Sequence, residues 1–598
     1  MTILLDSFNF SRSSDAVEES DLILIPGGSF VSTLAGDDTI RSEYTTDTPT
    51  ISLLNSSGDL TEAVFGIYNQ GSLNTGSGKD TIESNIKYTG ESSDVVVYGI
   101  TQAFGGLSNG FTSASIFTGS GDDSISALAS SSNSEEIIGI GNFFSSKINT
   151  GSGSDEIIGK ASGTAENSIR GISQVQSNDP DDVSTGTGNN RIITGNGDDK
   201  VIGNGDGQAE FILGISQNQG SNQIITGNGS DEIIGTGSGS GIAATGIFQG
   251  KGNNRIITGN GSDDIIGDAS SDNASRTIIG ILQGTGKNRI ITGNGSDEII
   301  GTASGNLNVI SEELAGTTVP AMAGISQQRE QKIITGNGSD EIIGTADGTA
   351  TSDNPNIPIP IVGIAKLNST INTGNSSDKV IGTASGAAVL IAGIAQQGSE
   401  DLIITGNGND EVMGKADGTA GIMAGIAQQP GTEGSKIITG NGNDKVTGEA
   451  VNKTQGLLTA GILGKLDILT GSGNDEVIAS ARLELTDPNQ EEPLIIGLDG
   501  FAADSKGTVT VNTGSGDDLV KGFGRGNFDG GTGDRDVYDL SEYSFDEFAI
   551  KIGAGTNNQV DFTLTDENLG SRTALTQGFE VFRFANDDVR SFSELTQE

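Results

Sequence analysis

The stretch Ile224–Gly235, IITGNGSDEIIG, decides the fold because the chain repeats it. The same twelve letters return at 290–301 and 333–344, and close variants begin at Ile192 and Ile403. Its central phrase, T-G-(N/S)-(G/S)-x-D, occurs 13 times between Thr75 and Asp518, most often 32 residues apart and always 31 to 44 apart. A recurring period of this length is the signature of a stacked repeat array. We therefore treat the chain as an array of repeats rather than a set of globular domains.

Each repeat contains short apolar runs broken by glycine. A second phrase, Gly-Ile-x-Gln, lies between successive loops, for example at Gly214 and Gly246. The runs are rich in isoleucine and too short for ordinary helices, which favours strands. The sequence predicts an all-β fold: an elongated parallel β-solenoid, β-helix-like or β-roll-like, of about 13 coils with about three strands each.

The composition supports a thin core and an acidic surface. Glycine makes up 93 of the 598 residues, proline only 10, and apolar residues 33%. The formal net charge is −47, so a nucleic acid is not an expected partner, because nucleic-acid binding needs a basic surface. The natural partner of such a chain is a cation.

Several catalytic and metal-binding arrangements are excluded by missing residue types. The chain has no cysteine and no histidine, which removes disulfides, thiolate zinc sites, Ser-His-Asp triads and HExxH motifs. We therefore expect a protein that is not an enzyme, with no catalytic residues. No window reaches 18 apolar residues, so no membrane span is expected.

The repeated aspartate is the candidate metal ligand. In a stack of coils about 4.8 Å apart, the aspartates of successive loops form a column of like charges. Each neighbouring pair then repels by roughly 3 kcal/mol at an effective dielectric constant of about 20. Calcium prefers carboxylate and carbonyl oxygens, and a divalent ion between loops would turn repulsion into bridging. The alternative is a simple turn with a solvated aspartate. The candidate metal ligands are Asp80, Asp123, Asp155, Asp199, Asp231, Asp263, Asp297, Asp340, Asp378, Asp410, Asp444, Asp475 and Asp518.

The phrase from Thr226 to Ile234 resembles the glycine-rich nonapeptide of RTX (repeats-in-toxin, haemolysin-type) calcium-binding proteins. Gly227, Gly229, Asp231 and Ile233 fall on the second, fourth, sixth and eighth positions of that repeat, whereas Thr226 replaces its first glycine. The resemblance implies calcium as the cofactor, carbonyls aimed at the metal by the glycines, and an aliphatic side chain in the core. It also implies export without a cleaved Sec signal, by a type I route that reads the C-terminus.

These observations predict three regions. Residues 1–70 form an N-terminal cap with a degenerate first coil, residues 71–540 the calcium-binding array, and residues 541–598 a β-rich cap with a candidate secretion signal. The expected function is that of a secreted, calcium-binding protein with a structural role at a cell surface or in an extracellular matrix. Surface or matrix polysaccharide and self-association are further expected interactions.

Two other functions stay open at this point. One is a glycan-binding or polysaccharide-modifying β-helix, similar to a lyase or epimerase; the other is a cytoplasmic acidic protein that needs no metal. The column of glutamines, among them Gln174, Gln217, Gln249 and Gln283, is either an amide ladder or a row of solvated side chains. For the asparagine of Gly-Asn-Gly we expect a role in the turn.

Overall fold

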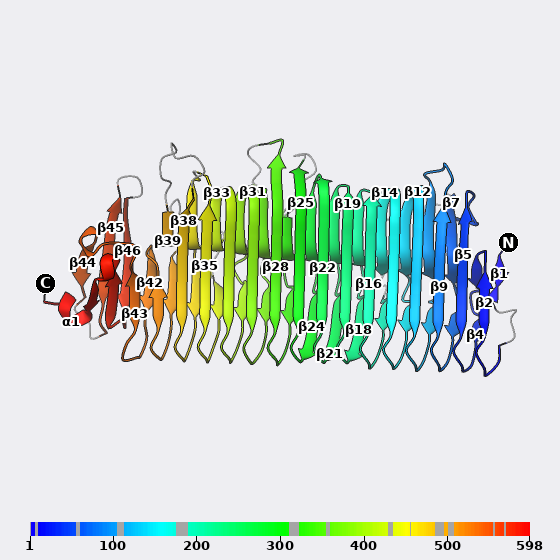
Figure 1. Ribbon diagram of the computed structural model, residues 1–598, viewed down its shortest axis with the longest axis horizontal. Coiled ribbons are helices and arrows are strands. Elements are labelled where there is room, and N and C mark those ends of the chain that lie inside the picture. The colour runs from blue at the N-terminus through cyan, green and yellow to red at the C-terminus, as the bar shows by residue number, and fades with distance from the viewer. Residues whose placement is uncertain are drawn as a thin grey trace. The chain divides into compact units, whose positions relative to one another are not determined.

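The computed structural model describes residues 2–5, 10–54, 60–103, 113–174, 189–309, 322–354, 359–428, 434–454, 456–484, 495–499, 508–553, 557–566 and 570–597. The chain divides into two compact units, residues 1–308 and residues 309–598. In each unit, parallel strands stack coil on coil, which confirms the predicted parallel β-solenoid (Figure 1).

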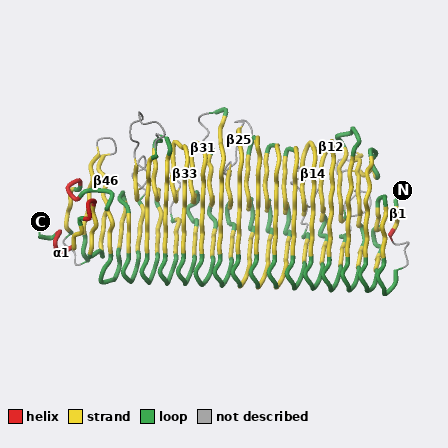
Figure 2. Tube along the Cα trace, viewed as in Figure 1, coloured by secondary structure: helices red, strands yellow, loops and turns green. Residues whose placement is uncertain are grey.

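One coil of the first unit illustrates the architecture. The short strand β18 (Gln223–Asn228) leads through the Thr-Gly-Asn-Gly loop into β19 (Glu232–Ser240), and after a bend β20 (Ala243–Gln249) carries the Gly-Ile-x-Gln phrase. Residues pair with their counterparts in the next coil, Ile224 with Ile256 and Ile233 with Ile265. The loops follow one another along one edge of each unit, as the green turns of Figure 2 show.

In the first unit, the strands before the loops are β4 (Phe30–Ser32), β8 (Ser72–Asn74), β11 (Ser115–Phe117), β13 (Lys147–Asn149), β15 (Arg191–Ile193), β18, β21 (Arg255–Asn260) and β24 (Arg289–Asn294). The strands after the loops are β2 (Ala16–Glu19), β5 (Thr39–Thr46), β9 (Thr81–Tyr88), β12 (Ser124–Asn142), β14 (Glu156–Gln174), β16 (Lys200–Gln208), β19, β22 (Asp264–Ala274) and β25 (Glu298–Val309). The remaining strands are β1 (Ile3–Leu4), β3 (Ile23–Ile25), β6 (Ile51–Leu54), β7 (Leu60–Asn69), β10 (Val95–Gln102), β17 (Phe211–Gln217), β20 and β23 (Thr277–Gln283).

The second unit repeats this arrangement. Its strands before the loops are β27 (Lys332–Ile334), β30 (Thr370–Asn372), β32 (Leu402–Ile404), β34 (Ser435–Ile438), β37 (Leu466–Leu469), β40 (Val509–Asn512) and β42 (Gly526–Asp529). The strands after the loops are β28 (Glu341–Ser352), β31 (Lys379–Gln396), β33 (Glu411–Gln428), β35 (Lys445–Asn452), β38 (Glu476–Leu483), β41 (Leu519–Lys521) and β43 (Val537–Leu540). The Gly-Ile strands are β26 (Met322–Gln327), β29 (Pro360–Lys366), β36 (Leu458–Leu463) and β39 (Ile495–Asp499).

The C-terminal segment closes the second unit as a β-rich cap. It contains η3 (Phe545–Glu547), β44 (Ala549–Ile552), β45 (Val560–Asp566), β46 (Gly570–Gln577), β47 (Val581–Phe584), η4 (Ala585–Asp587), β48 (Val589–Ser591) and α1 (Phe592–Leu595). β46 and β47 continue the parallel stacks on β42 and β43, whereas β45 and β48 run antiparallel to them. No helix among the described residues is long and apolar enough to cross a membrane.

The core is thin because it consists of columns of small and aliphatic side chains. In each Ile-Ile pair the first residue points inward: Ile224 and Ile233 are fully buried, whereas Ile225 and Ile234 on the opposite faces are partly exposed. The glycine that ends the Ile-Ile-Gly phrase faces the glycine of Gly-Ile-x-Gln. A Cβ on Gly235 would lie 2.3 Å from the carbonyl oxygen of Gly246, so the two layers touch backbone to backbone.

Candidate functional site: the stacked aspartate loops

The loop glycines allow the coils to stack at close range. Gly227 and Gly229 have φ values of 99° and 142°, which glycine adopts at little cost. A Cβ on Gly227 would lie 1.5 Å from the carbonyl oxygen of Gly195 in the neighbouring coil. The loop backbones are also paired: the N–H of Gly197 donates to the carbonyl of Asn228 at 2.9 Å. Glycine is therefore required by backbone contact between coils.

The repeated aspartate faces the interior of the loop stack and hydrogen-bonds between coils. The Asp199 N–H donates to Oδ1 of Asp231, and the Asp231 N–H donates to Oδ1 of Asp263, both at 3.0 Å. The same bond, at 2.8–3.1 Å, joins Asp38 to Asp80, Asp80 to Asp123, Asp123 to Asp155, Asp155 to Asp199 and Asp263 to Asp297 in the first unit. It joins Asp340 to Asp378, Asp378 to Asp410, Asp410 to Asp444, Asp444 to Asp475, Asp475 to Asp518 and Asp518 to Asp536 in the second.

All 13 aspartates named from the sequence lie in these two columns, and each is at most 2% exposed. The expectation of a column is thus confirmed, but the carboxylates are not solvated. In some coils, the threonine that opens the phrase donates to the second oxygen of the aspartate: the Thr194 hydroxyl lies 2.6 Å from Oδ2 of Asp199, and the Thr258 hydroxyl lies 2.6 Å from Oδ2 of Asp263. The Thr194 hydroxyl also lies 3.3 Å from the carbonyl oxygen of Thr226. A glycine at this position would make neither hydrogen bond.

The columns extend beyond the copies that the sequence motif identified. Asp15 donates its N–H to Asp38 at 2.8 Å, and Ser11 closes this end by donating its N–H to Asp15 Oδ2 at 2.7 Å. At the other end, Asp536 donates its N–H to Oε2 of Glu580 at 2.9 Å. The sequence contains a signal for two of these residues: the degenerate phrase TLAGDD ends at Asp38, and the phrase GGTGDRD ends at Asp536. Neither Asp15 nor Glu580 belongs to a loop phrase, and only the fold brings them into line.

A second ladder runs along the outside of the loops. The Asn228 amide donates to Oδ1 of Asn196 at 2.7 Å, and Asn260 donates to Asn228 at 2.8 Å. The second unit repeats this from Asn375 to Asn337 and from Asn407 to Asn375. The expected turn role of these asparagines was therefore incomplete, because their side chains also join exposed neighbouring turns.

The glutamine column is an amide ladder in the first unit. Gln217 donates to Gln174, Gln249 to Gln217 and Gln283 to Gln249, each at 2.9 Å and with all four side chains fully buried. In the second unit a lysine, Lys366, is aligned between Gln327 and Gln396. Its buried ammonium donates to the carbonyls of Ser369 and Leu402, and burial lowers its pKa to about 8 while Asp401 raises it.

The aspartates are difficult to ionise in this environment. Burial raises the pKa of Asp199 to about 6 and the charge of Asp231 adds to the rise, while the Thr194 hydroxyl and the backbone N–H of Asp155 lower it. Burial also raises the pKa of Asp231 to about 6 and that of Asp378 to about 7. The unperturbed value is 3.8, so near neutral pH the column is charged at a cost to the folded state.

This shift predicts an unusual pH dependence. Because the folded-state pKa lies above the unfolded value, the column stabilises the fold most below about pH 4 and loses that contribution as pH rises through about 6 to 7. We expect the thermal midpoint of metal-free protein, followed by circular dichroism, to fall between about pH 4 and about pH 7.5. A midpoint that rises over this interval would contradict the assigned shifts.

The loops meet the requirements of calcium only in part. Within the part of the chain that the structure describes, eight of these aspartates have a second oxygen that is buried but has no hydrogen bond of good geometry. They are Asp80, Asp123, Asp155, Asp231, Asp444, Asp475, Asp518 and Asp536. These oxygens are hard donors of the type calcium prefers. However, the described residues contain no group of three or more His, Cys, Asp or Glu side chains placed to hold a metal ion. A bound calcium ion would need backbone carbonyls or water for most of its ligands.

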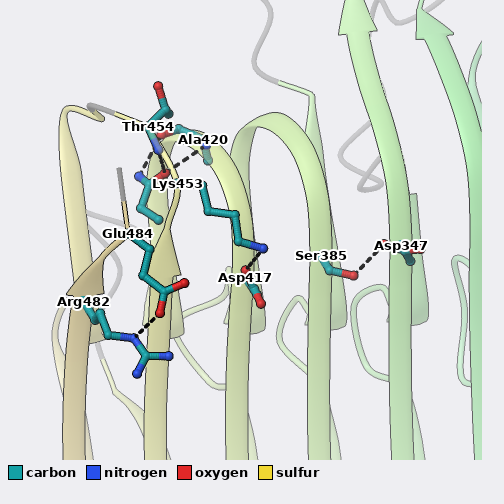
Figure 3. Close-up of polar contacts among 9 residues, drawn as sticks. Asp347, Ser385, Asp417, Ala420, Lys453, Thr454, Arg482 and Glu484 are labelled. Atoms are coloured by element: carbon teal, nitrogen blue, oxygen red, sulfur yellow. Dashed lines mark hydrogen bonds and ion pairs between the residues drawn. The ribbon is translucent and has the colours of Figure 1, made fainter. Parts of the chain in front are cut away.

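Exposed polar and charged side chains also form pairs between neighbouring coils. In the second unit, Ser385 donates to Asp347 at 2.6 Å and the Lys453 ammonium lies 2.7 Å from Asp417 (Figure 3). In the first unit, Lys200 lies 2.6 Å from Glu232 of the next coil. Such exposed pairs contribute little stability each. In the two lysine pairs, a cation of one coil lies beside an acid of an adjacent coil.

Comparisons with protein-family models, curated proteins and solved structures found no significant match to this chain.

Proposed function

We propose that this chain is a non-enzymatic structural protein, secreted and placed at a cell surface or in an extracellular matrix, with calcium as the cation that balances its aspartate columns. The observation that carries the structural role is the ladder of buried aspartates, in which each repeated carboxylate accepts the backbone N–H of a neighbouring coil. The repeated residues are thus used for stacking, as a one-dimensional scaffold requires.

The calcium part of the proposal rests on charge. The chain carries −47, and buried aspartates with raised pKa values destabilise the metal-free fold at neutral pH. A cation held at the unpaired Oδ2 atoms would favour the ionised carboxylates and remove this cost. The resemblance of the loop phrase to RTX repeats also supports calcium binding. It further implies export without a cleaved Sec signal.

Substitution of Asp231 by asparagine tests the hydrogen-bond ladder and the cation separately, because Oδ2 of Asp231 is one of the unpaired oxygens. Asparagine keeps an oxygen for the Asp199 N–H but carries no charge. We expect Asp231→Asn to raise the stability of metal-free protein at neutral pH by about 1–3 kcal/mol, since burial raises the pKa of Asp231 to about 6 and the neutral side chain avoids that cost. We also expect it to reduce the stabilisation that millimolar calcium gives the parent chain. The measurement is thermal unfolding in chelator and in calcium.

Asp272→Asn is the matched control, because it removes one charge from an exposed side chain of the same unit. It should behave like the parent chain in both buffers. Magnesium should not replace calcium, because it demands near-octahedral geometry and retains its water. If the parent chain unfolds at the same temperature with and without calcium, the calcium part of the proposal fails and the scaffold part remains.

A further inference from the structure

The outward face of the short strands in the first unit carries a row of cations. Strand register aligns Lys147 with Arg191, Arg191 with Gln223, Gln223 with Arg255, and Arg255 with Arg289. Strands β18, β21 and β24, which carry the last three positions, are labelled in Figure 1. We call Lys147, Arg191, Gln223, Arg255 and Arg289 the basic row. At a strand spacing of about 4.8 Å it is about 19 Å long.

The arginines of the basic row have no acidic partners, whereas several other cations of the described chain do. Among the described residues, no ion pair is formed by Arg191, Arg255 or Arg289, and all three are at least partly exposed. The outward positions of β13, β15, β18, β21 and β24 contain no aspartate or glutamate. By contrast, Lys200 pairs with Glu232, and in the second unit Lys453 pairs with Asp417 (Figure 3).

The corresponding row of the second unit differs. Its aligned positions are Lys332, Thr370, Leu402, Lys436 and Asp467, and the Lys436 ammonium lies 3.9 Å from the Asp467 carboxylate. The repeat architecture therefore does not by itself produce an unpaired cation row. On a chain of net charge −47, the first unit thus aligns three arginines without acidic partners along one narrow strip.

The surface beside the basic row is apolar. The neighbouring outward position in successive coils is Ile193, Ile225, Ile257 and Ile291, each partly exposed. Arginine forms paired hydrogen bonds to carboxylate and sulfate-like oxygens, and its guanidinium is more weakly hydrated than an ammonium group. A linear anion lying along the strip would contact guanidinium groups on one side and aliphatic carbons on the other.

We propose that the basic row binds a linear acidic polysaccharide. A single glycan strand matches a narrow strip: its carboxylate or sulfate groups face the arginines, and the C–H faces of its sugar rings cover the isoleucines. A second copy of this chain would bring another strongly acidic surface, and a nucleic acid would need a much broader basic surface. A linear acidic polysaccharide would be the partner of this chain in the proposed surface or matrix role. The biological setting of the binding rests on that proposed role, whereas the binding itself rests on the basic row.

The test compares two triple variants of the full chain. Arg191→Gln, Arg255→Gln and Arg289→Gln together remove the row, and the native Gln223 shows that glutamine fits this position. Lys79→Gln, Lys160→Gln and Lys200→Gln remove the same charge from exposed positions of the same unit outside the row. Binding to polygalacturonate, dextran sulfate and neutral dextran is measured by calorimetry at about 10 mM ionic strength, where screening is weak.

All proteins are compared at the same calcium concentration, at which circular dichroism shows each to be equally folded. We expect the parent chain and the lysine variant to bind one or both acidic glycans and not neutral dextran. The arginine variant should bind at least about tenfold more weakly, because each lost arginine removes charge-assisted hydrogen bonds. Polygalacturonate and dextran sulfate distinguish a carboxylated from a sulfated partner.

The proposal is overturned if the parent chain binds neither acidic glycan, or if the two triple variants bind equally. Either result with an intact circular dichroism spectrum leaves the scaffold and calcium proposals untouched, because those depend on the aspartate columns. Conversely, if calcium does not change the thermal unfolding of the parent chain, the comparison of glycan binding between the two triple variants still tests the basic row.

Discussion

Replacement of Gly227 by alanine is expected to destabilise the first unit by at least about 4 kcal/mol, a loss reserved for severe packing or backbone defects. The added Cβ would lie 1.5 Å from the carbonyl oxygen of Gly195, and φ at this position is 99°. The position of a Cβ is set by the backbone, and the atom that it would meet is a backbone carbonyl oxygen, so no change of rotamer relieves the clash. Denaturant unfolding followed by far-ultraviolet circular dichroism measures the loss.

Gly28→Ala is the matched control for this prediction. Gly28 also has a positive φ, 78°, but a Cβ there would have no atom within 4 Å. It should therefore cost only the backbone strain, about 1–2 kcal/mol. If the two substitutions cost the same, coil contact is not the reason for the loop glycines, and the carbonyl-aiming role implied by the RTX resemblance gains weight.

Removal of residues 541–598 is expected to leave the second unit aggregated or unfolded. The truncation deletes β46 and β47, the partners of β42 and β43, and exposes two strand edges that can pair with other chains. It also uncovers Tyr538, whose ring centroid lies 5.4 Å from that of Phe579. The measurement is the soluble fraction and its circular dichroism spectrum.

A shorter truncation provides the comparison. Removal of residues 592–598 deletes α1 but retains β45–β48, so the two stacks stay covered and the protein should remain soluble. Equal solubility of the two truncated proteins would show that the cap does not protect the strand edges. The same pair, expressed with a type I exporter, tests the proposed secretion: we expect export to be lost with residues 541–598.

The sequence alone was sufficient for the fold and for the location of the loops. The period of Thr-Gly-Asn-Gly-x-Asp and the short, isoleucine-rich runs between glycines predicted stacked strands, and the equivalent residues Ile224 and Ile256 are indeed paired. The prediction of the fold succeeds because a parallel array aligns each residue with the equivalent residue of the next repeat. A column of side chains in the structure is therefore already visible as a column when the repeats are aligned in sequence.

The tertiary structure decided what the columns do. Local sequence could not tell whether Asp231 faces solvent or accepts the Asp199 N–H, because that depends on the loop backbone of another coil, 32 residues away. The same holds for the Gln217 ladder, whose choice between water and a neighbouring amide is made by burial. Asp15 and Glu580 lie at column ends outside the phrase. Only stacking in three dimensions supplies such partners, because the hydrogen bonds run between coils rather than along the chain.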